Sequence, residues 1–311
     1  MRLILAPMEG VIDAQMRQLL TGLGGYDLCI TEFVRVTEQK LPPKVFYRLC
    51  PELATGGTTT SGTPVRVQLL GQSPDWLSIN AMTAIELGSP GIDLNFGCPA
   101  KTVNKSRGGA ILLKEPELIY QIIKAVREAV PKQYPVSAKI RLGYEDTNQT
   151  LEIADAVAQA NASELAVHAR TKKDGYRAPA YWEWIAKIRQ HVALPVIANG
   201  EIWDSESLIQ CQKQSGAEQF MVGRGAVATP NLGAVLTKKA TKMSWNDVLN
   251  LLILFAQQPV DEKNTIYYPS RTKQWFNYLK LSYPQAHDLF RKIRILSDRD
   301  AILNELKRAQ N

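Results

Sequence analysis

Cys98 lies in the part of the sequence that suggests chemistry most directly. It stands in a Gly-Cys-Pro turn at the start of a stretch, residues 95–110, that has glycines near both ends and is rich in lysine and arginine. Long loops of this kind in compact domains often carry function. A cysteine acts as a nucleophile or as an acid, depending on its pKa and its neighbours. The other cysteines lack such surroundings, and we interpret them as inert core side chains: Cys29, Cys50 and Cys211.

Polar residues also follow several short apolar runs of the chain. Gln68, Asn95, Lys139 and His168 each come at the end of such a run, and Glu32 follows another. A purely structural sheet has no need for these residue types at successive strand ends. Some of them could instead cap a helix or satisfy backbone groups. Because barrel enzymes place their sites at the C-terminal ends of the strands, we expect these side chains to surround one site.

Two glycines predict a phosphate site. Asn199-Gly200 and Gly223-Arg224 follow the last two apolar runs, and a glycine lets the backbone approach a ligand closely. Exposed N–H groups there, together with the guanidinium of Arg224, can hold a phosphate. The loops after strands 7 and 8 are also the usual phosphate position in TIM barrels.

The elements that must position these residues form a regular alternation. Short runs rich in Val, Ile and Leu are typical of buried parallel strands, and amphipathic segments follow them. Eight such units predict an α/β fold, a (β/α)8 TIM barrel. An open doubly wound sheet is the alternative, although no G-x-G-x-x-G follows the first run. The expected strands are residues 3–6, 28–31, 65–69, 92–95, 136–140, 165–168, 195–198 and 220–222, and the expected helices include 117–130, 150–160, 182–191 and 205–215.

The pattern changes after about residue 235. We expect residues 1–235 to form the barrel and residues 236–311 to form a small helical domain at the C-terminus, with no convincing strand. From residue 237 onward the chain has 13 Lys/Arg and 7 Asp/Glu, so that +6 of the net charge of +7 lies in this last part. The helices expected there are residues 245–257, 271–281, 285–296 and 298–308.

Composition limits the class of protein. A chain of 311 residues with 45% hydrophobic residues can bury a sizeable core. It contains no apolar run of roughly 20 residues, which a membrane span requires, and its first residues do not resemble a signal peptide. We therefore expect a cytoplasmic protein. The absence of a C-x-x-C pair argues against a zinc site, so no metal is expected. A sequence pI near 9.1 suits a polyanionic partner.

Several stretches together resemble a known family. APMEGVIDAQMR, VQLLG, DLNFGCPAKTVNKSRGGAILL, VSAKIRLG, VHARTKKDGY, PVIANGEI and FMVGRGA are similar to the motifs of the tRNA-dihydrouridine synthases, in the same order, and cover residues 5–226. The opening APMEGV and the C-terminal segment are closest to the bacterial C-type members. That resemblance implies reduction of uridine 16 in the D-loop of tRNA to dihydrouridine.

The resemblance also implies a flavin and a reductant. NADPH would supply the electrons, and no obligate protein partner is implied. The family often has Ala where Glu9 stands, so the backbone there could serve the flavin in place of the side chain. Lys139 could stabilise the reduced flavin, or could form a buried ion pair with Glu9, Glu32 or Glu201. The residues implied to bind FMN are Pro7, Met8, Glu9, Gln68, Lys139, His168, Asn199, Gly200, Glu201, Gly223 and Arg224.

The implied reaction needs a hydride and a proton. Reduced FMN would deliver hydride from its N5 to C6 of uracil, and Cys98 would donate the proton to C5. The base must leave its stack to reach the flavin. We expect Asn95 to read the uracil edge, and Arg141, His168 and Arg170 to hold its oxygens or the adjacent phosphate. Two alternatives remain: a reductase of a free pyrimidine, similar to a dihydroorotate dehydrogenase, and an RNA-binding protein with an inactive barrel.

The tail carries the expected tRNA contacts. Aromatic and basic residues interleave between residues 267 and 283, and Lys273, Asn277 and Lys280 fall on one helical stripe. The stripe is either an ordinary solvent-exposed helix face or, together with the neighbouring Arg271, a surface that binds the tRNA backbone. Further contacts with tRNA are expected from Lys101 and, near the flipped base, from Arg35 and Tyr176 on barrel loops.

Overall fold

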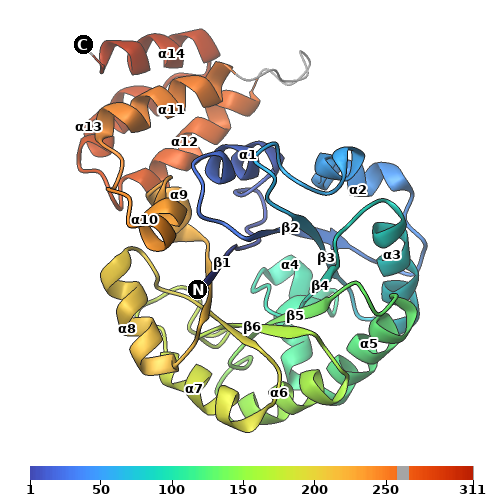
Figure 1. Ribbon diagram of the computed structural model, residues 1–311. Coiled ribbons are helices and arrows are strands. Elements are labelled where there is room, and N and C mark those ends of the chain that lie inside the picture. The colour runs from blue at the N-terminus through green and yellow to red at the C-terminus, as the bar shows by residue number, and fades with distance from the viewer. Residues whose placement is uncertain (258–265, 311) are drawn as a thin grey trace.

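The computed structural model describes residues 1–257 and 266–310, and its centre is a closed barrel. Eight parallel strands pair in sequence order, and the last strand pairs with the first (Figure 1). The predicted (β/α)8 architecture is therefore confirmed. The strands are β1 (Arg2–Leu5), β2 (Leu28–Arg35), β3 (Val65–Leu70), β4 (Ile92–Asn95), β5 (Val136–Arg141), β6 (Glu164–His168), β7 (Val196–Asn199) and β8 (Gln219–Val222).

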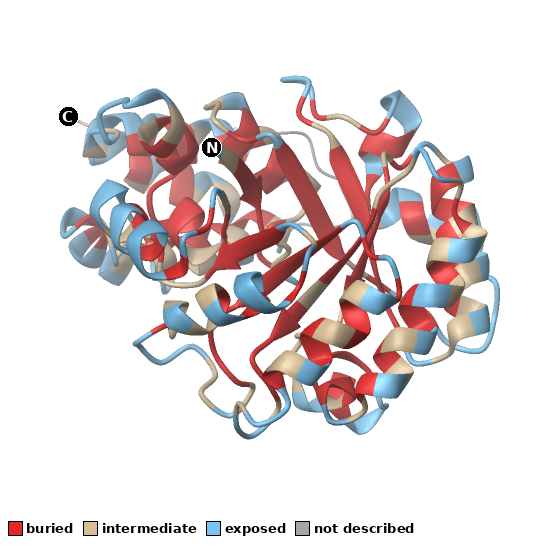
Figure 2. Ribbon diagram, turned by 60° about the horizontal axis from the view of Figure 1, so that its bottom comes forward, coloured by how far each residue is buried: buried red, intermediate tan, exposed pale blue. Residues whose placement is uncertain are grey.

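Helices surround this barrel and turn their apolar faces to it, so that the strands are buried and the outer helix faces are exposed (Figure 2). Helix α5 is an example of such an amphipathic helix. It begins with Pro116, at a position where a backbone N–H would have no helical acceptor, so the proline costs no hydrogen bond. One face of the helix is buried and consists of Ile119, Ile122, Ile123 and Val126. The helices of this part are α1 (Ala14–Gly22), α2 (Pro43–Leu49), η1 (Pro51–Thr55), α3 (Pro74–Glu86), α4 (Lys101–Lys105), η2 (Gly109–Lys114), α5 (Pro116–Ala129), α6 (Thr150–Gln159), α7 (Trp182–His191), α8 (Ser205–Ser215), α9 (Arg224–Ala228) and α10 (Leu232–Lys238).

Strand alternation divides the buried residues into two layers. Leu3 and Leu5 belong to the large apolar cluster between strands and helices, whereas Ile4 belongs to a small second cluster on the other face of β1. That small cluster draws on β1, β2, β6, β7 and β8. On β3, β4 and β5 the corresponding positions are polar, for example Gln68 and Asp93, and both are buried. The interior is therefore apolar around this small cluster, whereas the half formed by β3, β4 and β5 is a polar network; the buried Glu164 of β6, which pairs with Arg66, extends that network.

The predicted strands differ from the observed ones mainly at their ends, and most in β2. That strand continues to Arg35, because its pairing with β3 resumes after an irregularity between Ile30 and Phe33. Glu32 therefore lies within β2 rather than after it, and its carboxylate accepts the Gly10 N–H at 2.5 Å. The predicted loop of residues 95–110 also contains the short helix α4.

The tail packs at one side of the barrel, next to α1, α9 and α10 (Figure 1). Its buried indole, Trp275, donates to the Val227 carbonyl of α9 at 2.9 Å. The predicted helix 271–281 begins earlier, at Tyr267, and the expected boundary at residue 235 falls inside α10, so the division into two domains stays a prediction. The tail helices are α11 (Trp245–Gln257), α12 (Tyr267–Leu279), α13 (Gln285–Ile293) and α14 (Arg299–Arg308).

No helix within residues 1–257 and 266–310 combines the length and the apolar character that crossing a membrane would need.

Candidate functional site

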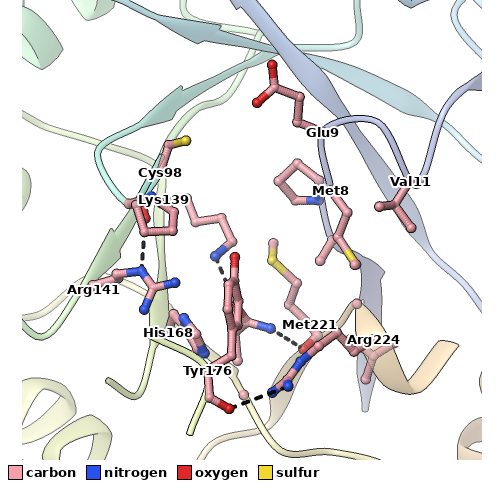
Figure 3. A pocket seen from close by; sticks show the side chains of 18 of the residues that line it. Met8, Glu9, Val11, Cys98, Lys139, Arg141, His168, Tyr176, Met221 and Arg224 are labelled. Carbon is pink, nitrogen blue, oxygen red and sulfur yellow. Dashed lines mark hydrogen bonds between the residues drawn. The ribbon is translucent and has the colours of Figure 1, made fainter. Parts of the chain in front are cut away.

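A cavity of about 480 Å³ opens at the C-terminal ends of the strands; we call it the barrel mouth (Figure 3). Most of the residues predicted from the sequence line it, although they come from seven of the eight strands and the loops that follow them. Strand register contributes to this convergence, since Asn95 pairs with Lys139, and His168 pairs with both Arg141 and Asn199, all near the C-terminal ends of their strands. The predicted residues in its lining are Pro7, Met8, Glu9, Gln68, Asn95, Cys98, Lys139, Arg141, His168, Tyr176, Asn199, Gly200, Glu201, Gly223 and Arg224.

The Cys98 turn is held from three directions. Asn95 accepts the backbone N–H groups of Gly97 and Cys98 through its Oδ1 atom, both at 2.9 Å. The Cys98 carbonyl accepts from the side chain of Asn104 at 2.9 Å. Gly109 has a φ of +65°, and a Cβ there would lie 2.9 Å from the Cβ of Cys98. Only a glycine therefore lets the returning chain pass so close to the thiol.

The thiol of Cys98 is half-buried, while the other three cysteines are buried, as predicted. Burial raises the pKa of Cys98, the backbone N–H of Ala100 opposes this shift, and the Glu9 carboxylate adds to it. A cysteine with a raised pKa is a thiol at neutral pH and not a thiolate. The side chain is thus suited to donate a proton rather than to attack as a nucleophile.

Lys139 is a half-buried cation in the lining of the mouth. Its Nζ donates to Asn199 Oδ1 at 3.0 Å, and Asn199 in turn donates to the Met221 carbonyl at 2.8 Å. Burial, followed by repulsion from Arg141, lowers the pKa of Lys139 to about 8. Among the described residues it forms no ion pair with a glutamate, so the alternative of a buried Lys–Glu pair is not what the structure has. Its charge therefore faces the cavity at neutral pH.

The loops after β7 and β8 each place a glycine in the wall of the cavity. Gly200 has a φ of +117°, and a Cβ there would lie 2.9 Å from the His168 ring. A Cβ on Gly223 would lie 2.9 Å from the Met8 sulfur. Beside them Arg224 donates to Glu201 at 2.6 Å, which holds the guanidinium at the edge of the mouth. The corner thus combines glycine backbone in the cavity wall with a positioned cation, an arrangement that suits a phosphate.

Arg170 corrects one expectation. We predicted that Arg170 faces the substrate. Its side chain is instead fully buried and pairs with Glu201 at 2.7 Å. It also donates to His168 Nε2 at 3.2 Å, which leaves the ring proton of a neutral His168 on Nδ1. Burial and the cations around it lower the pKa of His168 well below its usual value. Arg170 therefore orients His168 and Glu201 from beneath the site.

Arg141 is also buried, yet it lines the cavity. Its guanidinium donates to the carbonyls of Gly97 at 2.9 Å and Gly175 at 2.8 Å. It lies 5.1 Å from the ring centre of Tyr176, and so does the guanidinium of Arg224. The half-exposed Tyr176 ring therefore covers both arginines at the outer rim, while Arg141 ties the Cys98 turn to the loop that carries Tyr176.

Besides Arg170, four of the residues expected to contact tRNA lie outside the cavity lining. Arg35 and Lys101 are exposed at the end of β2 and the start of α4. Arg271 donates to the carbonyl of Val11 and pairs with Asp13 at 3.1 Å, so it joins the tail to the loop after β1. Lys273 is half-exposed on α12. Their contacts with tRNA stay predictions.

Sequence reasoning missed several lining residues. Tyr278 reaches the cavity from α12 in the tail, and Phe33 and Trp203 reach it from the barrel. The only signal for Tyr278 was its place in the segment where aromatic and basic residues interleave. Asp93, buried beneath the cavity, was also missed, because an aspartate within an apolar run gives no hint of its partners.

The fold and the mouth define the class of protein first. A closed (β/α)8 barrel with its polar residues gathered at the C-terminal ends of the strands has the layout of the barrel enzymes. Residues 4–305 match the family described as dihydrouridine synthase (Dus), so the chain belongs to the dihydrouridine synthase family. The resemblance expected from the motifs is thereby confirmed.

Relatives match over the whole chain. A protein of Shewanella oneidensis named tRNA-dihydrouridine(16) synthase is 54% identical over 100% of this chain and 99% of its own length. A Pasteurella multocida protein of the same name is 55% identical over 100% of both. Among solved structures, a variant of NCR from Zymomonas mobilis superposes with a TM-score of 0.55 at 15% identity, covering 78% of this chain and 88% of that one. Morphinone reductase in complex with tetrahydroNAD gives 0.53 at 12% identity, with the same coverages. Likenesses at such low identity show the fold alone.

Proposed function

We propose that this protein reduces uridine 16 in the D-loop of tRNA to 5,6-dihydrouridine, with FMN as cofactor and NADPH as reductant. The observation that carries the proposal is the Cys98 turn, which holds a protonated thiol at the rim of a cavity that the cation Lys139 also lines. The names of full-length relatives, tRNA-dihydrouridine(16) synthase, support the substrate and the position. A tRNA substrate would also place the protein in the cytoplasm.

The residues of the mouth fit FMN. A volume of about 480 Å³ lies within the range of roughly 300–1,000 Å³ found for cofactor sites. Gly200 and Gly223 both line the cavity, and a side chain at either position would collide with His168 or Met8, so these close approaches require glycine. Arg224 and the backbone of these two glycines would hold the phosphate, while Gln68 and Lys139 would face the ring. Bound FMN, once reduced, would supply the hydride for C6 of uracil.

The chain itself would supply the proton and the orientation. Cys98 would donate its Sγ proton to C5, where negative charge develops as C6 is reduced. Its raised pKa keeps that proton in place at neutral pH. Lys139 would stabilise the negative charge of the reduced ring. Glu201, shared between the buried Arg170 and Arg224, would keep Arg224 aimed at the phosphate.

The test uses purified FMN-loaded protein, NADPH and an unmodified tRNA transcript with uridine at position 16. We expect dihydrouridine at that position, mapped by mass spectrometry of nuclease fragments. The matched control is the same transcript with cytidine at position 16, which should gain no dihydrouridine. Product at another uridine would refute the assignment of position 16, and no product on any tRNA would refute the proposed activity. Replacing NADPH by NADH compares the two reductants.

A further inference from the structure

A buried carboxylate lies directly beneath the barrel mouth and takes no part in the reaction proposed above. Asp93, on β4, is 1% exposed. One of its oxygens accepts from Gln68 Nε2 at 2.7 Å, and the other accepts from Ser137 Oγ at 2.5 Å. Both partners come from the neighbouring strands β3 and β5. Asp93 thus sits at the centre of the polar half of the barrel interior.

The bond to Gln68 determines what that side chain presents to the next residue. A glutamine amide has a donor end and an acceptor end, and the surrounding hydrogen bonds decide which end points where. Because Nε2 of Gln68 donates to Asp93, its Oε1 is turned to Asn95 and accepts from Nδ2 at 2.7 Å. The Oδ1 of Asn95 is then left to accept the N–H groups of Gly97 and Cys98.

We propose that Asp93 is a positioning residue for the Cys98 turn, acting through the amides of Gln68 and Asn95. The proposal rests on the proposed function in so far as Cys98 is its acid. An ionised carboxylate can only accept, so it selects the donor end of Gln68, and that choice passes along the chain of amides to the backbone of Cys98. If both amides were reversed, the NH2 group of Asn95 would face two N–H donors, which would leave the turn without its acceptor.

The surroundings of Asp93 support an ionised group. Burial raises its pKa to about 6, while the bonds from Gln68 and Ser137 and the charges of Arg66 and Lys139 act in the opposite direction. Arg66 donates to Ser137 Oγ at 2.9 Å, so the hydroxyl hydrogen of Ser137 is free to point at Asp93. At pH 7.5 the carboxylate is therefore charged and acts as an acceptor on both sides.

Asp93→Asn keeps the shape of the side chain, but the new amide no longer selects the donor end of Gln68. The new amide can turn its NH2 group to Gln68, which makes the reversed arrangement of both amides accessible. We expect the Cys98 turn to loosen, and the thiol to be alkylated about three- to tenfold faster, as when one neutral hydrogen bond is lost. The measurement is the rate of iodoacetamide reaction with the FMN-loaded protein at pH 7.5. Cys98→Ala serves as the blank, because the other cysteines are buried.

Two comparisons separate positioning from a general loosening of the core. Asn95→Ala cuts the last link and should accelerate alkylation as much as Asp93→Asn, and the double variant should be no faster than Asn95→Ala alone. Ser137→Ala removes the other bond to Asp93 but leaves the link to Gln68, so it should react at the wild-type rate. Multiplying effects in the double variant, or acceleration by Ser137→Ala equal to that of Asp93→Asn, would overturn the proposal.

A second variant covers the case in which Asp93→Asn does not fold. Gln68→Met breaks the same chain one step closer to the turn and should give the same faster alkylation, while an unchanged rate would overturn the proposal. The alkylation reaction needs neither NADPH nor tRNA. Failure of the amide chain therefore shows in the alkylation rates, whereas failure of the proposed function shows only in the tRNA product of the wild-type protein.

Discussion

The barrel mouth and the helical tail both carry many cations, but they hold them differently. Behind the wall of the mouth, Arg170 has a fully buried side chain bound to a carboxylate, and within the mouth Lys139 donates to a buried amide. In the tail, Arg291 and Arg308 keep 74% and 76% of their side chains exposed and form only i,i+3 pairs. Buried, fixed charges suit chemistry that needs preorganisation, whereas exposed charges act at longer range on a polyanion. The difference predicts that the mouth governs catalysis and that the tail governs affinity.

Arg271 differs from these exposed cations of the tail, because it lies where the tail contacts the barrel. It belongs to α12, yet its guanidinium binds the carbonyl of Val11 and the carboxylate of Asp13, and Tyr267 donates to the same Asp13 at 2.7 Å. These contacts connect the tail with the loop that carries Met8 and Glu9 into the mouth. Any effect of replacing Arg271 would therefore mix docking with the shape of the mouth.

The largest effect is expected from Cys98→Ala. Removing the acid should slow the reoxidation of reduced FMN by tRNA by about 10²–10⁴-fold, the usual contribution of a general acid. Reduction by NADPH should stay normal, because the thiol serves only the second half of the reaction. Stopped-flow absorbance of the flavin follows both steps. Reoxidation by tRNA at the wild-type rate would show that Cys98 is not the general acid.

Lys139 offers a pH test of the same region. Burial lowers its pKa to about 8, so its positive charge is present below that pH and is lost as the pH rises through it. We expect the rate of flavin reduction by NADPH to fall across that range. Lys139→Met should lower the rate about 10²-fold at pH 7 and abolish this fall, the size expected for losing one preorganised charge. A pH profile that is the same in both proteins would contradict the role of Lys139.

Arg224→Ala tests the phosphate corner. Losing a charge-assisted hydrogen bond should weaken FMN binding about 10- to 100-fold. The flavin content after dialysis and a titration of the apoprotein with FMN measure this loss. Arg177→Ala is the matched control, since Arg177 is exposed on a neighbouring loop and does not line the cavity. Equal flavin retention in the two variants would mean that the phosphate lies elsewhere.

The smallest effect belongs to the tail. Lys273→Ala should weaken tRNA binding and reduce the salt dependence of the affinity by up to about 1 in the log–log slope, because one phosphate contact is lost. Lys124→Ala removes an equal charge from an exposed position of α5 and should change neither quantity. Flavin content should be the same in both. An unchanged salt slope for Lys273→Ala would leave its stripe as an ordinary solvated face.

The sequence was sufficient for the fold and for most of the mouth, because both depend on local patterns. Each strand is a short apolar run. Because all strands of the barrel are parallel, the residue that ends each strand lies at the C-terminal end of the barrel. The failures are tertiary. Arg170 follows β6 as an exposed residue would, and it is held inside by partners outside its strand, Glu201 after β7 and the carbonyls of Arg177 and Pro179. Tyr278 reaches the mouth only because α12 docks on the barrel, and Glu32 lies inside β2 because the pairing of that strand continues after an irregularity.

The choice between tRNA and a free pyrimidine as substrate can be decided in a single experiment. Protein whose FMN has been reduced by NADPH is mixed without oxygen, in parallel, with unmodified tRNA and with a free pyrimidine such as orotate or UMP. We expect tRNA to reoxidise the flavin in a single turnover and to leave one dihydrouridine per flavin, while the free pyrimidines leave the flavin reduced. Reoxidation by a free pyrimidine as fast as by tRNA would instead show that the protein is a small-molecule reductase. It would also contradict the assignment of catalysis to the mouth and of tRNA affinity to the tail.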